Sequence, residues 1–436
     1  MAIIRQRSIF SWRDIDDLQD LERLCLVIEY MPDEELMRDL EIRRKNGRNK
    51  HPVRGVWNSV LAGIVFGHES VEQLRRELGR NGQLRELCGL TGKPSSSCYS
   101  RFFEKLMQMP EAVEAMFDRL LSEIAEVLPG FGSNLAVDSK AIHSHGRPLG
   151  ISNPKRQQPD GRRDTDADVA IKEYRGKKRD TAWQRVVGWF GYKLHLVVDA
   201  SYELPVEFEV APASSSDIRK GHELVDKLEK DHPDILDGCE VLLADRGYDD
   251  VKLIRRLWDD HEVRPIIDIR NIWRDGEDTK VLGDRWNVVY DYRGQIYCHC
   301  PQTSKRRKMA YGGFEKDRQT LKYRCPVRHY GVDSCRGRDR CKAARGLRVP
   351  MSYNRRVFTP VARPSHRWKR LYRKRTSVER VFSRMDVSFG FERHYIRGLA
   401  KMRLRCTLTF CVMLAMALGR VKEKRPDLMR SLVRVA

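Results

Sequence analysis

The strongest constraint in this sequence is the octapeptide LLADRGYD at residues 242–249, which sets a carboxylate between an apolar strand and a glycine turn. A buried strand is a rigid support, so we expect Asp245 to be held firmly at one end of a sheet. Two more carboxylates have comparable settings, because Asp138 ends the apolar run 135–137 and Glu379 opens a helical pattern in a very basic segment. Three such acids in a basic protein indicate metal-dependent chemistry on a nucleic acid.

The charge balance supports a polyanionic partner. The 436 residues include 83 Lys and Arg against 61 Asp and Glu, a net charge of +22 that is spread in clusters along the chain. Residues 1–14 carry charges every few positions and the apolar run 406–418 is short, so neither a signal peptide nor a membrane span is predicted. The 11 cysteines, odd in number and mostly scattered, are typical of reduced thiols in the cytoplasm, and no disulfides are expected.

Hydrophobic periodicity divides the chain into regions of different type. Residues 14–127 show helical spacing almost throughout and predict an all-helical N-terminal domain. Within it, helical pieces between 69 and 107 flank a turn cluster at 91–97. That pattern predicts either a helix-turn-helix DNA reader or a compact helical bundle for dimerisation, and the sequence does not separate the two.

From residue 135 the period changes to that of strands. We expect strands at 134–138, 192–199, 204–210, 240–245 and 263–269, with helices at 218–230 and 249–261, which together predict an α/β layer with a mixed sheet. Two segments lack clear periodicity. Residues 146–188 are predicted to form a long exposed loop, and residues 270–365 a Cys- and Arg-rich insertion with weak strand signals. A basic helix at 366–389 and an apolar core helix near 400–420 follow.

Each acid also has an ordinary structural interpretation. Asp138 could cap a turn, and Asp199 competes with it at the end of the second strand. Asp245 could be a turn residue ahead of Gly247, whose freedom at positive φ suits such a bend. Glu379 fits a capping box, in which its carboxylate reaches back to the backbone N–H three residues earlier.

The helical spacing around Glu379 adds a further argument. Tyr372, Arg375 and Glu379 lie at i, i+3 and i+7 and are expected to share one face, where the Tyr and Arg could hold DNA phosphates. The opposite face is apolar at the same period and is expected to face the core. Its residues are Val378, Val381, Phe382 and Met385.

Four phrases, in this order and at these separations, resemble bacterial insertion-sequence transposases of the DDE type. They are AVDSK at 136–140, GYKLH at 191–195, ADRGY at 244–248 and Y-x2-R-x3-ER at 372–380, and the resemblance spans residues 14–418. It implies an RNase H-like catalytic core with an insertion before the catalytic Glu. By position, Asp138, Asp245 and Glu379 would be the metal-binding triad, with Mg²⁺ or Mn²⁺ as the cofactor.

The resemblance also implies a reaction and a partner. A metal-activated water would cleave the DNA at a transposon end, and the freed 3′-OH would attack target DNA. The expected partner is double-stranded DNA, both the terminal inverted repeats and the target, bound by a homodimer in the bacterial cytoplasm at the nucleoid, with no membrane. The predicted DNA-binding residues are Tyr372, Arg375, Arg246, Lys193, Trp368 and Arg380.

One position departs from the family pattern. The family often has a Lys seven residues after the catalytic Glu, whereas this chain has Asp386 there. Arg384 is the nearest candidate to replace that cation. The departure puts one DNA contact beside Glu379 in doubt.

A cysteine cluster and two basic runs remain. Cys298, Cys300, Cys325, Cys335 and Cys341 are enough donors for a structural Zn²⁺, but their spacing is not that of paired Cys-x2-Cys knuckles, so reduced thiols in an irregular insertion are the alternative. The run 363–384 combines many cations with His, Trp and Tyr and predicts phosphate contacts and base stacking. Residues 305–308 fit either DNA contact or a flexible loop.

We therefore predict four parts. Residues 1–130 form a helical DNA-binding or dimerisation domain, 131–270 the first part of the catalytic core, 271–365 the insertion, and 366–436 the helices that complete the core. The predicted function is that of an insertion-sequence transposase. The alternatives are a non-catalytic DNA-binding protein derived from a transposase and a metal-dependent nuclease without strand transfer.

Overall fold

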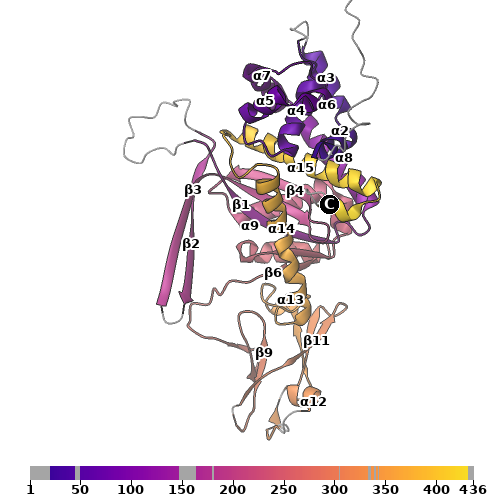
Figure 1. Cartoon of the computed structure of the whole chain (residues 1–436). Coiled ribbons are helices and arrows are strands. Elements are labelled where there is room, and N and C mark those ends of the chain that lie inside the picture. Colours follow the sequence, from indigo (N-terminus) through magenta and orange to yellow (C-terminus); the bar gives the residue numbers. More distant parts are fainter. Residues whose placement is uncertain are drawn as a thin grey trace, which may run out of the picture.

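The computed structural model describes most of the chain. The described residues are 20–44, 50–146, 164–178, 181–303, 305–331, 335–337, 340–341 and 343–430. Figure 1 shows helices of the N-terminal region at one end of the molecule, the main sheet in the middle, and small sheets from residues 280–350 at the other end.

The N-terminal region is helical, as predicted, over its described residues. Its helices are α2 (Asp20–Tyr30), α3 (Glu34–Arg44), α4 (Val53–Val65), α5 (Val71–Arg80), α6 (Gly82–Leu87), α7 (Ser96–Met107) and α8 (Pro110–Val127). Side-chain caps define two of the starts, because Ser70 accepts from the Gln73 N–H and Ser95 from the Cys98 N–H. Helix α4 is buried on nearly all sides and forms the centre of this bundle.

The main sheet places a central strand between antiparallel and parallel neighbours. Strand β1 (Asn134–His143) pairs antiparallel with β3 (Thr181–Asp199), which pairs with β4 (Leu204–Pro212). On its other side β1 pairs parallel with β5 (Val241–Ala244), which pairs with β6 (Arg264–Ile267). The intervening helices are α9 (Asp217–Asp231), α10 (Pro233–Asp237) and α11 (Val251–Asp259). The mixed α/β layer predicted from the sequence is confirmed.

The prediction of one long loop at 146–188 is wrong for the described part of that segment. Strand β2 (Asp168–Lys178) pairs antiparallel with the first half of β3 and makes a ribbon that projects from the sheet (Figure 1). Both faces of such a ribbon meet solvent, so its strands need no buried apolar stripe and show no clear period. Residues 147–163 lie outside the described residues.

The C-terminal segment returns to the main sheet. Helix α13 (His366–Arg373), a 3₁₀ turn (Lys374–Thr376), helix α14 (Ser377–Ser383) and a π-helical turn (Arg384–Ser388) replace the single helix expected at 366–389. Helix α14 packs on β1 and β3. Helix α15 (Leu399–Lys422) and a final 3₁₀ turn (Pro426–Leu428) follow.

Helix α15 joins the helical bundle to the sheet. It contacts α2, α4 and α8 on one side and β4 on the other. By length and composition this helix could cross a membrane, and it is the one such helix among the described residues. However, 83% of its most apolar stretch is buried within the protein. That burial is typical of a core helix, the role predicted from its short apolar run.

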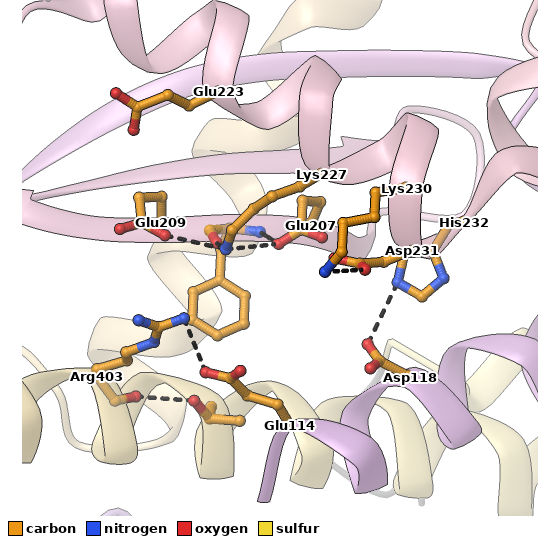
Figure 2. A network of polar contacts seen from close by, with 12 residues as sticks. Glu114, Asp118, Glu207, Glu209, Glu223, Lys227, Lys230, Asp231, His232 and Arg403 are labelled. Carbon is orange, nitrogen blue, oxygen red and sulfur yellow. Dashed lines mark hydrogen bonds and ion pairs between the residues drawn. The ribbon is translucent and has the colours of Figure 1, made fainter. Parts of the chain in front are cut away.

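A polar network reinforces this junction (Figure 2). The ammonium of Lys227, on α9, lies 2.9 Å from a carboxylate oxygen of Glu209 and 3.4 Å from one of Glu207, both on β4. Nearby, Arg403 of α15 pairs with Glu114 of α8 at 2.8 Å. Charged pairs thus connect α9 to the sheet and α15 to the N-terminal bundle.

Between β6 and α13 the chain forms two further sheets with their own small core. Strands β7 (Lys280–Leu282), β8 (Arg285–Tyr290), β9 (Ile296–His299) and β10 (Arg306–Lys308) make one sheet. Strands β11 (Ala310–Glu315), β12 (Thr320–Arg324) and β13 (Leu347–Pro350) make the other, accompanied by α12 (Pro326–Tyr330) and a 3₁₀ turn (Met351–Tyr353). The weak strand signals of this region therefore correspond to short strands.

Candidate active site

Strand register brings two of the predicted acids together. Val137 on β1 is opposite Ala244 on the parallel strand β5, so the residues that follow them, Asp138 and Asp245, are neighbours at the same edge of the sheet. The first and fourth of the expected strands are thus adjacent in the sheet. Asp245 directly follows the buried strand β5, whereas Asp138 lies within β1, which continues to His143 and so is longer than the expected strand 134–138.

Helix α14 brings Glu379 to the same edge. Arg375 connects the acids, because its guanidinium donates to Asp138 Oδ2 at 2.6 Å and to Glu379 Oε1 at 2.8 Å. The opposite face of the helix is buried as predicted, at Val378, Val381, Phe382 and Met385. The capping-box interpretation is wrong: the Thr376 hydroxyl donates to the Arg373 carbonyl, and the Glu379 carboxylate pairs with Arg375.

The electrostatics of the site centre on Asp138. Burial raises the pKa of its carboxyl to about 6, and the neighbouring charge of Asp245 acts in the same direction. The Ser139 N–H and the Arg375 guanidinium act against this shift. Burial thus disfavours the charged form of Asp138, and a cation bound beside this carboxylate would stabilise that form.

The structure separates Asp138 from its competitor Asp199. The Asp199 side chain is fully buried and accepts hydrogen bonds from the backbone N–H groups of Gly132, Ser201 and Tyr202. These bonds close the turn between β3 and β4. Asp199 is therefore a structural residue.

Asp245 has both of the roles considered for it. It caps the 3₁₀ turn Arg246–Tyr248 by accepting the Gly247 N–H at 2.7 Å, and it still lies beside Asp138. The expectation of positive φ at Gly247 is wrong, because this residue is absent from the positive-φ glycines of the described chain. Glycine is needed for space instead: a β-carbon would lie 2.7 Å from Asp245 Oδ1 and 3.2 Å from Asp217 Oδ2.

Asp217 belongs to a supporting network that sequence reasoning missed. Its Oδ1 accepts from the Ser139 hydroxyl and from the Lys193 ammonium, each at 3.1 Å. Lys193 also donates to the Ser215 carbonyl at 2.9 Å. The predicted DNA residue Lys193 therefore holds Asp217 behind the carboxylates, and its fixed place in the GYKLH phrase was the available signal.

An open groove of about 390 Å³ runs past Asp138 and Glu379, and Lys140 and Asp386 form an ion pair in its wall. Lys140 is thus a cation beside the acids that the sequence did not reveal, because its partner is 246 residues away. The suggestion that Arg384 replaces the missing Lys is wrong. Arg384 points away from the groove and donates to the Glu203 carbonyl.

The predicted DNA-binding side chains differ in their exposure to solvent. Arg246 is exposed next to Asp245, and Arg380 is half-exposed and pairs with Glu203. Tyr372 is half-buried and stacks on Trp368, with ring centroids 4.6 Å apart. Trp368 is buried, so its predicted contact with bases is wrong.

The basic run 363–384 likewise contains both buried and exposed cations. Arg363, at its start, is fully buried and donates to the backbone carbonyls of Ile267, Arg356 and Val357, which makes it a structural residue. The exposed cations of the run lie on and just after α13. They are Arg367, Lys369, Arg370, Arg373 and Lys374, and one more exposed cation, Arg380, lies on α14.

The three acids have the right donor atoms for a divalent cation, but one side chain, that of Arg375, would have to move before they could share it. Within the described ranges, no three His, Cys, Asp or Glu side chains lie close enough together to hold a metal ion. Asp138, Asp245 and Glu379 offer the oxygen donors that Mg²⁺ and Mn²⁺ prefer. Because the Arg375 guanidinium lies between Asp138 and Glu379, a cation shared by these two acids would take its place.

The five cysteines of the insertion, which the sequence placed in one cluster, line one cavity. Each is a free thiol. Hydrogen bonds from the Thr303 hydroxyl, then from backbone N–H groups including that of Gln302, lower the pKa of Cys300 to about 6. Burial raises the pKa of Cys298 to about 11, and the charges of Cys341, Cys325 and Cys335 add to this shift.

Comparison with known proteins identifies the family. The family described as "Transposase DDE domain" matches residues 129–415, more than half of the chain. No curated protein sequence matches. Among solved structures, the chain is similar to a piggyBac transposase in a synaptic complex with hairpin DNA, at 12% identity and a TM-score of 0.38, over 97% of this chain and 80% of that one. The match over residues 129–415 spans Asp138, Asp245 and Glu379, and the chain belongs to the DDE-domain transposase family.

Proposed function

We propose that this protein is the transposase of an insertion sequence, which binds terminal inverted repeats, cleaves DNA with Mg²⁺ or Mn²⁺, and joins the freed 3′-OH to target DNA. The family match supports this function. The observation that carries the proposal is that Asp138 and Asp245 are neighbours on adjacent parallel strands, while Asp138 and Glu379, bridged by Arg375, line one open groove.

We also infer that the sheet is an RNase H-like core, as the sequence resemblance implies. Its support is the central β1, with antiparallel β3 and β4 on one side and parallel β5 and β6 on the other. Residues 131–270 and 366–436 would make up this core. Residues 271–365 would be the insertion and 1–130 the DNA-binding or dimerisation domain.

In the proposed mechanism the three acids would hold the cofactor, and two of them, Asp138 and Glu379, line the groove. A bound divalent cation lowers the pKa of water and stabilises the leaving oxygen of the phosphodiester. Asp138 and Asp245 come from rigid strands, so their separation changes little during the reaction, whereas Glu379 has an exposed side chain that can rotate. If a bound cation displaces Arg375 from the carboxylates, its guanidinium would be free to bind a DNA phosphate beside the site.

The DNA is proposed to follow the cations around this groove. Lys140 lies in the groove wall, Arg246 is exposed beside Asp245, and the exposed cations of α13 lie on the helix just before Arg375. Such cations neutralise phosphates without reading sequence. A homodimer on paired ends, acting at the nucleoid in the cytoplasm, is part of the proposal.

Asp245→Asn tests the site with little change of shape, because an amide oxygen can still accept the Gly247 N–H. We expect the variant to bind end DNA and to lose Mg²⁺-dependent cleavage by at least about 100-fold. Asp250→Asn is the matched control, since Asp250 also caps a helix by accepting the Leu253 N–H and lies outside the groove. Equal cleavage by wild type and Asp245→Asn would refute the site. Cleavage without joining of the 3′ end to a second duplex would indicate a nuclease.

A further inference from the structure

A second cluster of reactive side chains lies at the opposite end of the molecule from the N-terminal helices, between β9 and α12 (Figure 1). Cys298, Cys300, Cys325, Cys335 and Cys341 come from separate short segments of the insertion, yet all five line the same small cavity. The cavity measures about 20 Å³, room for one object of the size of a water molecule or an ion. Neither Asp nor Glu is among its lining residues.

Two of the sulfur atoms already have the separation of ligands to one ion. Cys300 Sγ and Cys335 Sγ are 3.7 Å apart. In a tetrahedral zinc site with Zn–S bonds of about 2.3 Å, the sulfur atoms are about 3.8 Å apart. In a disulfide they would be bonded at about 2.05 Å.

The surroundings of these sulfurs also resemble those of metal-bound thiolates. Cys300 Sγ accepts from the Thr303 hydroxyl and from the backbone N–H groups of Gln302, Thr303 and Gly337. Cys341 Sγ accepts from the Asn287 amide at 3.2 Å. Donors of this kind fix a thiolate in place and stabilise its negative charge, which is the role of the residues around metal ligands. The guanidinium of Arg307 lines the same cavity and supplies compensating positive charge.

We propose that the insertion binds one structural Zn²⁺ through four of these five thiolates, with Cys300 and Cys335 as two of the four. Thiolates favour Zn²⁺ over Mg²⁺, so this site would be distinct in chemistry from the carboxylate site. The described thiols do not yet converge as a set. Binding would therefore draw Cys298, Cys325 and Cys341 inward by side-chain rotation, and one of these three would remain unbound.

The zinc would stabilise a part of the chain that has few other means of folding. The insertion has short strands and a small core separate from that of the rest of the protein. Small domains of this kind commonly depend on a metal for stability. Because the insertion lies between β6 and α13, its folding also supports the approach of α13 and α14, and with them Glu379, to the sheet.

The test is the metal content of the full-length protein, purified under reducing conditions and incubated with Zn²⁺ before excess metal is removed. Elemental analysis should find one zinc per chain in the wild type and in Cys98→Ser, a control on α7 outside the insertion. Cys300→Ser and Cys335→Ser should each lose it. Replacement with Co²⁺ should give the visible absorption of tetrahedral cobalt thiolate in the wild type.

A second measurement does not depend on whether the variants fold. Peptide mapping after alkylation of native wild-type protein should show four cluster cysteines protected until a zinc chelator is added. Wild type without zinc, retention of zinc by both serine variants, or alkylation that the chelator does not change would each overturn the proposal. Asp245→Asn should retain its zinc, so failure of the zinc site and failure of the proposed transposase activity are distinguishable.

Discussion

Gly247→Ala offers a sharp test of how the strand-end carboxylate is positioned. The added β-carbon would lie 2.7 Å from Asp245 Oδ1, whereas ordinary contacts begin at about 3.4 Å. The difference of about 0.7 Å must be absorbed by the carboxylate or by the turn that it caps. On the other side the new carbon meets Asp217 Oδ2 at 3.2 Å, so the turn has little freedom to move that way.

The expected result is a large loss of catalysis with a small loss of stability. Displacement of a catalytic group by about 1 Å can lower a rate by about 100-fold, so DNA cleavage should fall by roughly 10- to 100-fold. The free energy of unfolding should fall by only about 1 kcal/mol. Local overpacking costs about 1–3 kcal/mol, and the smaller entropy of an unfolded chain with Ala in place of Gly returns about 0.4–1 kcal/mol.

The assay compares single-turnover cleavage of end DNA at saturating Mg²⁺ with denaturant unfolding of the same preparations. Gly92→Ala is the control, because its β-carbon would have one ordinary contact, at 3.9 Å, outside the groove. Wild-type cleavage by Gly247→Ala would refute the claim that this glycine is required for the position of Asp245. A loss of several kcal/mol in stability would show that the turn, and not the carboxylate alone, depends on it.

Three further outcomes are expected. Lys227→Met should lower the free energy of unfolding by about 3 kcal/mol by leaving Glu207 buried and unpaired. Because burial raises the pKa of Glu207, its protonation should shrink this loss as pH falls through that raised pKa, and a loss that does not vary with pH would contradict the reasoning. Lys140→Ala should slow cleavage about 10-fold, and adding Asp386→Lys, which restores a cation to the groove wall, should recover most of the rate; no recovery would exclude that role for Lys140. Arg370→Ala should weaken DNA binding and reduce the slope of log K against log salt by about 1, and an unchanged slope would place this residue off the DNA.

Local sequence pattern was sufficient to predict much of the fold of this protein. The change from helical period to strand period near residue 135 predicted the N-terminal bundle and the mixed sheet, because each element buries one face and its apolar residues repeat at the period of that element. The order and spacing of the motifs around Asp138, Asp245 and Glu379 were likewise readable, since each motif is a local structure: a strand, a turn, or one face of a helix.

Local pattern failed where the outcome depended on neighbours that are distant in sequence. The β2–β3 ribbon packs too little of its surface on the core to need an apolar stripe, and Trp368 and Arg363 looked like DNA contacts until packing buried them. Lys193 was predicted to bind DNA, whereas in the structure it pairs with Asp217, which lies 24 residues further on and could not be recognised as its partner from local pattern.

The sequence by itself therefore determined the element types, the three acids and the basic character of the molecule. The tertiary structure alone decided which side chains meet: Arg375 between Asp138 and Glu379, Lys140 against Asp386, and five cysteines around one cavity. The physical reason is that period and turn chemistry act within a few residues. Ion pairs and shared cavities are instead set by the register of strands and by the packing of helices between elements far apart in the chain.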